Sequence, residues 1–438
     1  MRILFVVPYT PTAIRVRPYS FVRFLAQRGH TVILATLWES EAEQQALQKL
    51  RADGIQVMAA PLNRSQKLRN VLRAWQRGLP IQAAFCESPQ LLDQIQQFLR
   101  TEPVDVIHVE HLRGAAYGLA LLRQQTAPVV WDSVDCITHL FEQAASRSRS
   151  LTGRLMTGLE LPRTRRYESS LPHQFKRVLV TSINDQAALQ QLAQRGTDIQ
   201  VVTNGVDLDY FAPDSTPYTP DTVVYSGKMS YHANVTAALF LAEQIMPLVW
   251  RHKPNARLVI AGSKPTQAIQ QLTQDARIQV TGYVEDLRQP LLQAAVAVAP
   301  LLYGAGIQNK VLEAMACGTP VVATSQAVSA LAIRPGQDCL VADNNDALAI
   351  SILEVLNNGT LRARLSQQGR RFVETHHDWQ HIIAQLERHY QDVQHDAPHY
   401  ADNRATSIGG EYSYVQQLSN TPATSKPSTP MATHAQSG

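Results

Sequence analysis

Residues 299–323 read APLLYGAGIQNKVLEAMACGTPVVA, and this stretch decides the fold class of the 438-residue chain. The apolar run Val296–Leu302 predicts a buried strand that ends before Gly304. A helix is expected from Asn309 to Cys317, with Gly318 as a left-handed C-cap and a second strand over Val321–Ala323. A strand, a glycine loop, a helix and a strand in this order are typical of an α/β protein with a parallel sheet.

The expected helix carries two charges, Lys310 and Glu313, three residues apart and therefore on one face. A lysine in the first helical turn is opposed by the helix dipole unless an anion compensates it. The free N–H groups of Gly304, Gly306 and Ile307 favour the same anion. On spacing alone two interpretations remain open. Lys310 pairs with Glu313, or Lys310 binds a nucleotide diphosphate while Glu313 accepts hydrogen bonds from the ribose.

Composition indicates a soluble globular protein, with 45% apolar and 17% charged residues and enough length for two domains. A net charge of +4 is too small to indicate nucleic acid as a partner. The cysteines are scattered without metal-site spacing, so we expect reduced thiols, a cytoplasmic location and no metal. We see no signal peptide and no apolar run of the roughly 20 residues that a membrane span needs.

Short apolar strands alternate with helices along both halves of the chain, which predicts two doubly wound, Rossmann-like domains. The alternation breaks at Asn204–Pro220, a stretch rich in proline and aspartate that reads as a linker. We therefore expect an N-terminal domain over 1–205, a C-terminal domain over 206–375 and a final helix over 379–393. Residues 396–438 are nearly free of large apolar side chains and predict a disordered tail.

Several motifs, taken in order, resemble one known family. They are VVTNGVDLDYF (Val201–Phe211), VVYSGKMSYHANVTAALFLAEQIMPLV (Val223–Val249), LVIAGSKP (Leu258–Pro265), VTGYVEDLRQPLLQAAVAVAPL (Val280–Leu301), KVLEAMACGTPVVAT (Lys310–Thr324) and DWQHIIAQLERHY (Asp378–Tyr390). The chain resembles the retaining nucleotide-sugar glycosyltransferases of family four, over roughly residues 1–393. The resemblance implies a GT-B fold, with two domains facing across a cleft and the helix 379–393 crossing back to the first domain.

The resemblance places the donor, a UDP- or GDP-linked sugar, in the second domain. Gly227 and Lys228 match the basic turn on the diphosphate, Tyr283 and Val284 match the loop beside the base, and Glu313 matches the glutamate on the ribose. The implied donor-binding set is Gly227, Lys228, Tyr283, Val284, Gly304, Gly306, Ile307, Lys310 and Glu313. Lys310 also counts as catalytic, because it could stabilise the departing diphosphate.

One position departs from the family. Many members carry a second glutamate eight residues before the one that matches Glu313, and that second glutamate is usually linked to the transferred sugar. In this chain Ala305 stands at that position. This departure makes a non-catalytic sugar-nucleotide-binding protein an alternative to a transferase. A second alternative, within the enzymes of this fold, is a GT-B nucleotide-sugar epimerase. A dehydrogenase is disfavoured, because no GxGxxG follows the first strand.

The first domain is expected to hold the acceptor, a glycan, a lipid-linked sugar or a small molecule. Glu110 and His111 directly follow the expected strand Val104–Val109. They could orient an acceptor hydroxyl or take its proton, or they could be ordinary loop residues. The expected acceptor-binding residues are Arg15, Arg17, Asp132 and Asp135. The alternative is that the two arginines are ordinary surface residues and that the two aspartates only cap a turn.

Two further patterns bear on partners. Asp207-Leu208-Asp209 resembles a metal-binding DxD but lies in the linker, so we read it as a turn and expect neither metal nor cofactor. Arg64–Arg77 and Arg147–Arg166 are basic, and the first interleaves cations with apolar residues. These stretches suggest peripheral attachment to an anionic membrane surface, with a solvated helix face as the alternative.

Overall fold

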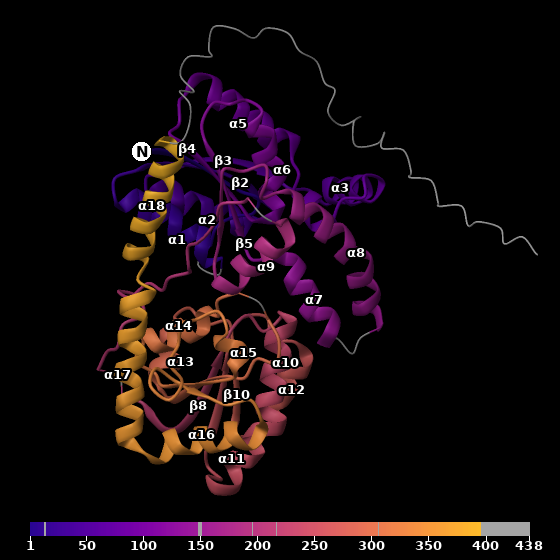
Figure 1. Cartoon of the computed structure of the whole chain (residues 1–438). Coiled ribbons are helices and arrows are strands. Elements are labelled where there is room, and N and C mark those ends of the chain that lie inside the picture. The colour runs from indigo at the N-terminus through magenta and orange to yellow at the C-terminus, as the bar shows by residue number, and fades with distance from the viewer. Residues whose placement is uncertain (13–14, 148–150, 195, 216, 305, 396–438) are drawn as a thin grey trace, which may run out of the picture. The chain divides into compact units, whose positions relative to one another are not determined.

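The computed structural model describes residues 1–395, except 13–14, 148–150, 195, 216 and 305. The tail expected at 396–438 and the departure at Ala305 therefore lie outside the described residues. Within the described part, two parallel sheets with flanking helices follow one another along the chain (Figure 1). The expected α/β class, with two doubly wound domains, is confirmed.

The first sheet has seven strands in the order β3-β2-β1-β4-β5-β6-β7, all paired in parallel. Its strands are β1 (Arg2–Val7), β2 (Thr31–Trp38), β3 (Gln56–Pro61), β4 (Val106–Glu110), β5 (Val129–Val134), β6 (Arg177–Val180) and β7 (Ile199–Val201). Strands β1 and β4 are central and nearly all of their side chains are buried. The order reverses between β1 and β4, the position where doubly wound sheets bind ligands beyond their carboxyl ends.

Helices cover both faces of this sheet. They are α1 (Val16–Gln27), α2 (Glu41–Ala52), α3 (Arg64–Gln76), α4 (Ile81–Ala84), α5 (Pro89–Thr101), α6 (His111–Leu122), α7 (Ile137–Arg147), α8 (Leu151–Ser170) and α9 (Ile183–Ala193). The last helix of the described chain, α18 (Trp379–His395), returns to this domain and packs beside α1 (Figure 1). Its Trp379, Ile383 and Tyr390 join the core of β1.

The second sheet has six strands in the order β10-β9-β8-β11-β12-β13, again parallel. They are β8 (Thr219–Ser226), β9 (Arg257–Ala261), β10 (Ile278–Gly282), β11 (Ala294–Ala299), β12 (Val321–Ala323) and β13 (Leu340–Val341). The helices are α10 (His232–Phe240), the π-turn η1 (Leu241–Ile245), α11 (Met246–His252), α12 (Gln267–Gln271), the 3-10 turn η2 (Leu272–Gln274), α13 (Arg288–Leu292), α14 (Asn309–Ala316), α15 (Ser325–Val328), α16 (Asn345–Asn357) and α17 (Gly359–His376).

One helical run in the described chain, His232–His252, is long and apolar enough by composition to cross a membrane. The expectation that no segment reaches that length is therefore wrong. The run is nevertheless mostly buried, and its Leu241, Ile245 and Val249 lie in the core of the second domain. Its apolar character reflects packing between sheet and neighbouring helices.

The linker expected at Asn204–Pro220 is irregular up to β8, which begins at Thr219. Asp207 caps a turn there, because its carboxylate accepts the Tyr210 N–H at 3.0 Å and its carbonyl accepts the Phe211 N–H at 2.7 Å. The interpretation of Asp207-Leu208-Asp209 as a turn is confirmed.

Candidate active site

The donor side of the site is built where β8, β9 and β11 end. A Cβ added to Gly262, which follows β9, would lie 1.7 Å from the carbonyl oxygen of Gly227, which follows β8. The two loops can therefore approach this closely only because both residues are glycines. Gly227 has φ +153°, and a Cβ on it would meet Asn234 Nδ2 at 2.8 Å. This close packing brings Asn234 and Lys310 against the end of β8.

Lys310 lies in the first turn of α14 and is half-buried. Its Nζ donates to Asn234 Oδ1 at 2.5 Å and to the Tyr225 hydroxyl at 3.4 Å, and it lies 5.0 Å from the centre of the Tyr225 ring. Burial lowers the pKa of Lys310 to about 8, while the nearby Glu313 opposes that shift. All of its protein partners in the described chain are neutral, so the ammonium has no bonded counter-ion.

Glu313 lies one turn later on the same face and is also half-buried. Burial raises its pKa to about 7, and the Lys310 charge acts in the opposite direction. No ion pair within 4.0 Å joins the two side chains, since the lysine bonds Asn234 instead. The spacing left two interpretations open. The first of them, an ion pair between Lys310 and Glu313, is absent from the described residues.

The remaining donor candidates lie in loops that follow the strands of the second sheet. Lys228 is exposed in the turn after β8, and Tyr283 is exposed just after β10 with 74% of its surface accessible. Gly304, Gly306 and Ile307 precede α14, and Gly304 O accepts from Gln326 at 2.9 Å. Val284 is half-buried beside Tyr283. The structure thus places seven of the nine candidates on loops at the carboxyl ends of β8, β10 and β11, and the other two, Lys310 and Glu313, in α14.

On the first domain, Tyr9, Arg15, Glu110 and His111 come together at the ends of β1 and β4. The Tyr9 hydroxyl donates to Glu110 Oε1 at 2.6 Å, and the Arg15 guanidinium lies over the Tyr9 ring at 4.8 Å. Glu110 is buried and its Oε2 has no hydrogen-bond partner among the described residues. Burial and the Asp132 charge raise the pKa of Glu110 to about 8, so it is mostly protonated at neutral pH.

His111 has a positive φ of +66°, which is uncommon outside glycine. Its Nδ1 accepts the Arg113 backbone N–H at 3.2 Å, and burial lowers its pKa to about 3. The ring is therefore neutral, and that hydrogen bond assigns the proton to Nε2. Because Nδ1 already accepts that hydrogen bond, Nε2 is left to donate one, which suits the first of the two roles that the sequence position suggested, orienting an acceptor hydroxyl.

Arg17 and Asp132, both expected on the acceptor, are buried and bonded to each other, with Arg17 Nε 2.7 Å from Asp132 Oδ2. Arg17 Nη1 also donates to the carbonyl of Val202 at 2.8 Å and to Asn204 Oδ1 at 3.1 Å. Asn204 in turn donates to Asn309 Oδ1 at 3.4 Å, next to Lys310. These contacts give Arg17 and Asp132 the role of an internal brace between β5, the linker and α14.

Asp135 follows β5 after a strained residue. Val134 is β-branched yet has φ +69°, a conformation that costs about 1–3 kcal/mol and is concentrated at functional sites. A Cβ added to Gly306 would lie 2.5 Å from Asp135 Oδ1, so the carboxyl faces the loop before α14. Burial and the Asp185 charge raise the pKa of Asp135 to about 7.

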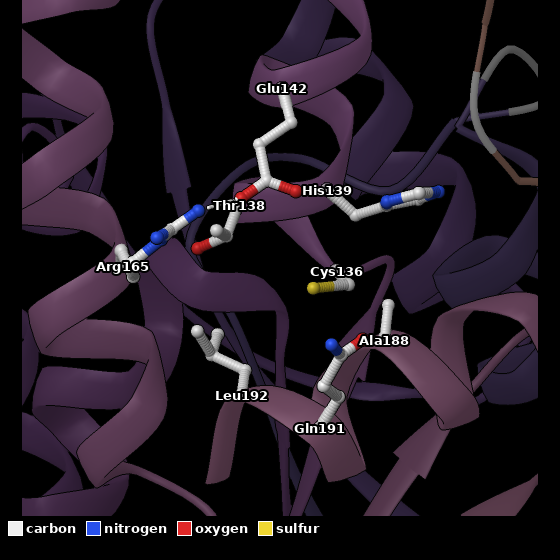
Figure 2. A pocket seen from close by; sticks show the side chains of 8 residues that line it. All are labelled: Cys136, Thr138, His139, Glu142, Arg165, Ala188, Gln191 and Leu192. Carbon is white, nitrogen blue, oxygen red and sulfur yellow. Dashed lines mark hydrogen bonds and ion pairs between the residues drawn. The ribbon is translucent and has the colours of Figure 1, made fainter.

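A separate cavity of about 300 Å³ lies among α7, α8 and α9 (Figure 2). It is lined by Cys136, Thr138, His139, Glu142, Arg165, Ala188, Gln191 and Leu192. Its arginine, Arg165, is paired with Glu142. A diphosphate would therefore meet a carboxylate there, and the cavity shares no lining residue with the donor candidates.

Sequence reasoning missed Tyr9 and Tyr225. Tyr9 stands directly after the first strand with Pro8, a position from which ligands are contacted in doubly wound sheets. Tyr225 looked like an ordinary buried strand residue, and nothing in its local sequence distinguishes it from one. Its role depends on the approach of α14, which only the tertiary structure gives.

Two family models match the chain in sequence. "Glycosyltransferase Family 4" matches residues 16–210, and "Glycosyl transferases group 1" matches residues 220–358. The phosphatidyl-myo-inositol mannosyltransferase of Mycobacterium tuberculosis is 25% identical over 314 residues, covering 68% of this chain and 77% of the relative. The O-antigen chain mannosyltransferase B of Escherichia coli is 33% identical over 156 residues, covering 33% of this chain and 39% of the relative.

Solved structures agree on the fold. Sucrose-phosphate synthase from Thermosynechococcus elongatus superposes with a TM-score of 0.69 at 16% identity, over 91% of this chain and 100% of that one. HepE of Anabaena, in complex with UDP and glucose, gives 0.61 at 16% identity, over 90% and 100%. The family models and the fold agree with the motifs: the chain belongs to the family 4 glycosyltransferases and is an enzyme of the hexosyltransferase type with a GT-B fold.

Proposed function

We propose that the enzyme transfers a hexose from a nucleotide-diphosphate sugar, UDP- or GDP-linked, to a lipid-linked or glycan acceptor with retention of configuration. The observation that carries this proposal is the pair at α14: an ammonium, Lys310, without a bonded counter-ion, and a carboxylate, Glu313, that the ammonium leaves unpaired. A diphosphate supplies the missing anion, and ribose hydroxyls supply donors to the carboxylate. Lys228, exposed after β8, adds a second cation on the diphosphate, and Tyr283 provides a face for the base.

Bond breaking places negative charge on the diphosphate oxygen that leaves the sugar carbon. Lys310, the start of α14 and the N–H groups of Gly306 and Ile307 stabilise that charge, which is the largest single contribution that such a site offers. The acceptor oxygen forms the new bond to the same carbon on the same face. Glu110 is mostly protonated and His111 presents an N–H donor, so neither is a ready base. The acceptor proton therefore passes to the departing phosphate oxygen, while His111 orients a hydroxyl.

The mannosyltransferase relatives suggest a mannosyl donor and a lipid acceptor as the first candidates to test. Helix α3 supports delivery from a membrane surface. Its Leu68, Leu72 and Trp75 are spaced by four and three residues, and each exposes more than half of its surface. Arg64 and Arg69 are exposed and lie one turn from Leu68 and Leu72, so this stripe can lie on anionic lipid with each of these cations contributing about 1 kcal/mol.

The test of transfer uses the full chain with radiolabelled GDP-mannose or UDP-glucose and a membrane extract as acceptor. We expect label to move from one donor into the lipid or glycan fraction. Lys310→Met should abolish transfer without lowering the melting temperature by more than a few degrees. No transfer and no donor hydrolysis with any UDP- or GDP-linked hexose would overturn the proposal.

The test of membrane attachment is flotation with vesicles containing anionic phosphatidylglycerol, with neutral phosphatidylcholine vesicles alongside. We expect the protein to float with anionic vesicles at low salt, and Leu72→Ser with Trp75→Ser to release it. Ile350→Ser is the matched control, because Ile350 is a similarly exposed apolar residue on α16. Equal flotation of both variants would remove α3 as the attachment surface.

A further inference from the structure

We propose that Asp135, a residue of the first domain, binds the hydroxyl groups of the transferred sugar and thereby sets which hexose the enzyme accepts. This inference rests on the proposed function, because it assumes a nucleotide-sugar at α14. It assigns Asp135 to the donor sugar rather than to the acceptor, where its sequence position alone placed it.

The position of the carboxyl carries the first step. A Cβ built on Gly306 would meet three Asp135 atoms, Oδ1 at 2.5 Å, Cγ at 3.4 Å and Oδ2 at 3.7 Å. Both oxygens therefore face the backbone of the loop that precedes Lys310. If that loop holds the diphosphate, the sugar attached to it lies beside the loop, within reach of Asp135. The strained Val134 is what turns the chain at this point, since β5 ends there.

The bonding of the carboxyl carries the second step. In the described chain it takes part in no ion pair within 4.0 Å, and the hydrogen bond it accepts comes from the Thr181 hydroxyl at a long 3.4 Å. A carboxylate can accept about four hydrogen bonds, so most of its acceptor capacity is left for a ligand. Two neighbouring sugar hydroxyls are well suited to the two oxygens.

The sequence carries the third step. The loop has Ala305 beside Gly306, eight residues before Glu313, so it brings no carboxylate of its own to the sugar. Asp135 reaches the same loop from the other domain. A contact supplied across domains would also form only when both domains surround the donor, which excludes water from the reacting carbon. The competing explanation is that Asp135 only braces the glycine loop.

The experiment compares the unaltered enzyme with Asp135→Ala and the isosteric Asp135→Asn, using the parent nucleotide-hexose and its 2-, 3-, 4- and 6-deoxy analogues. Binding of the nucleoside diphosphate alone is measured in parallel. We expect Asp135→Ala to lower kcat/KM for the parent donor by about 10- to 150-fold, the range of hydrogen bonds to a charged group. The loss of rate should be smaller with each deoxy donor that lacks a hydroxyl bound by Asp135 than with the deoxy donors that keep both hydroxyls. Nucleoside diphosphate affinity should stay within twofold.

A rescue variant sharpens the comparison. Ala305→Glu in the Asp135→Ala background supplies a carboxylate from the loop itself, and we expect it to recover part of the lost rate. Equal rate loss over all deoxy donors, or an equal loss of nucleoside diphosphate affinity, would overturn the proposal in favour of a brace. The unaltered protein separates the two proposals. If it binds no nucleotide-sugar, the proposed function fails. If it binds one, and Asp135→Ala loses the same rate with every deoxy donor, only the role of Asp135 is removed.

Discussion

The affinity for a nucleotide-sugar should depend on pH with a maximum between about 7 and 8. On each side of this maximum the affinity falls, and we call the two sides the acid limb and the alkaline limb of the profile. The acid limb comes from Glu313, with a pKa of about 7, and the alkaline limb from Lys310, with a pKa of about 8. Below pH 7 Glu313 is protonated and loses its capacity to accept two ribose hydroxyls. Above pH 8 Lys310 is neutral and no longer attracts the diphosphate. Binding should therefore release a proton on the acid side and take one up on the alkaline side.

The size of each limb follows from the distance to each pKa. At pH 5.5 about 3% of Glu313 is ionised, so Kd should rise by up to about 30-fold, or about 2 kcal/mol. At pH 9 about a tenth of Lys310 is charged, and Kd should rise by about tenfold, or about 1.4 kcal/mol. Since Glu313 and Lys310 interact, the two apparent pKa values that the profile reports belong to the pair rather than to either residue alone.

Isothermal titration calorimetry from pH 5.5 to 9, in two buffers of different ionisation enthalpy, measures both Kd and the protons exchanged. A nucleotide-sugar is the right ligand, because a free terminal phosphate titrates near pH 6 and would obscure the acid limb. Glu313→Gln should flatten the acid limb and Lys310→Met the alkaline limb. A flat profile in the unaltered enzyme, or limbs that survive in both variants, would refute the assignment.

Three further outcomes follow from the packing. Gly262→Ala should lower the free energy of unfolding by at least about 2 kcal/mol, because its Cβ would lie 1.7 Å from Gly227 O. Gly78→Ala, at a positive φ of +65° with open space around it, should cost less, and chemical denaturation compares the two. Arg17→Met should lower the free energy of unfolding by about 3–5 kcal/mol, because it leaves Asp132 buried without its arginine partner. Arg277→Met should lower it by under about 1 kcal/mol, because the pair of Arg277 with Asp275 is more exposed. Equal losses would contradict the role of Arg17 and Asp132 as a brace. His111→Ala should lower kcat by about 10- to 100-fold with unchanged nucleoside diphosphate affinity, and a change in affinity instead would place His111 on the nucleotide.

The fold could be predicted closely from sequence because apolar periodicity and glycine punctuation agree along most of the chain. The strand Val321–Ala323, for example, has the bounds that its pattern predicts. Other bounds are harder to read from sequence: α13 ends at Leu292, and Ala294 already begins β11 and pairs with Thr219. Alanine-rich sequence carries no period that separates a helix end from a strand start.

The candidate site was less predictable than the fold. The position of Lys310 at a helix start could be read locally, but its partners Tyr225 and Asn234 are 85 and 76 residues away. The sequence likewise gives no sign that Arg17 is buried, since an arginine ahead of a helix is usually exposed. Burial here depends on Asp132, 115 residues later, which compensates the charge.

The most direct test of the central claim is the affinity of the unaltered enzyme and of Lys310→Met for UDP, GDP and ADP, measured by calorimetry at pH 7.5. The account predicts that at least one of the three binds and that Lys310→Met weakens that binding at least tenfold. Lys253→Met is the unchanged control, because Lys253 follows α11 and pairs with Asp221 near the start of β8, at the opposite end of the strands from the donor site. Binding that Lys310→Met leaves intact would contradict the claim that the start of α14 holds the donor diphosphate.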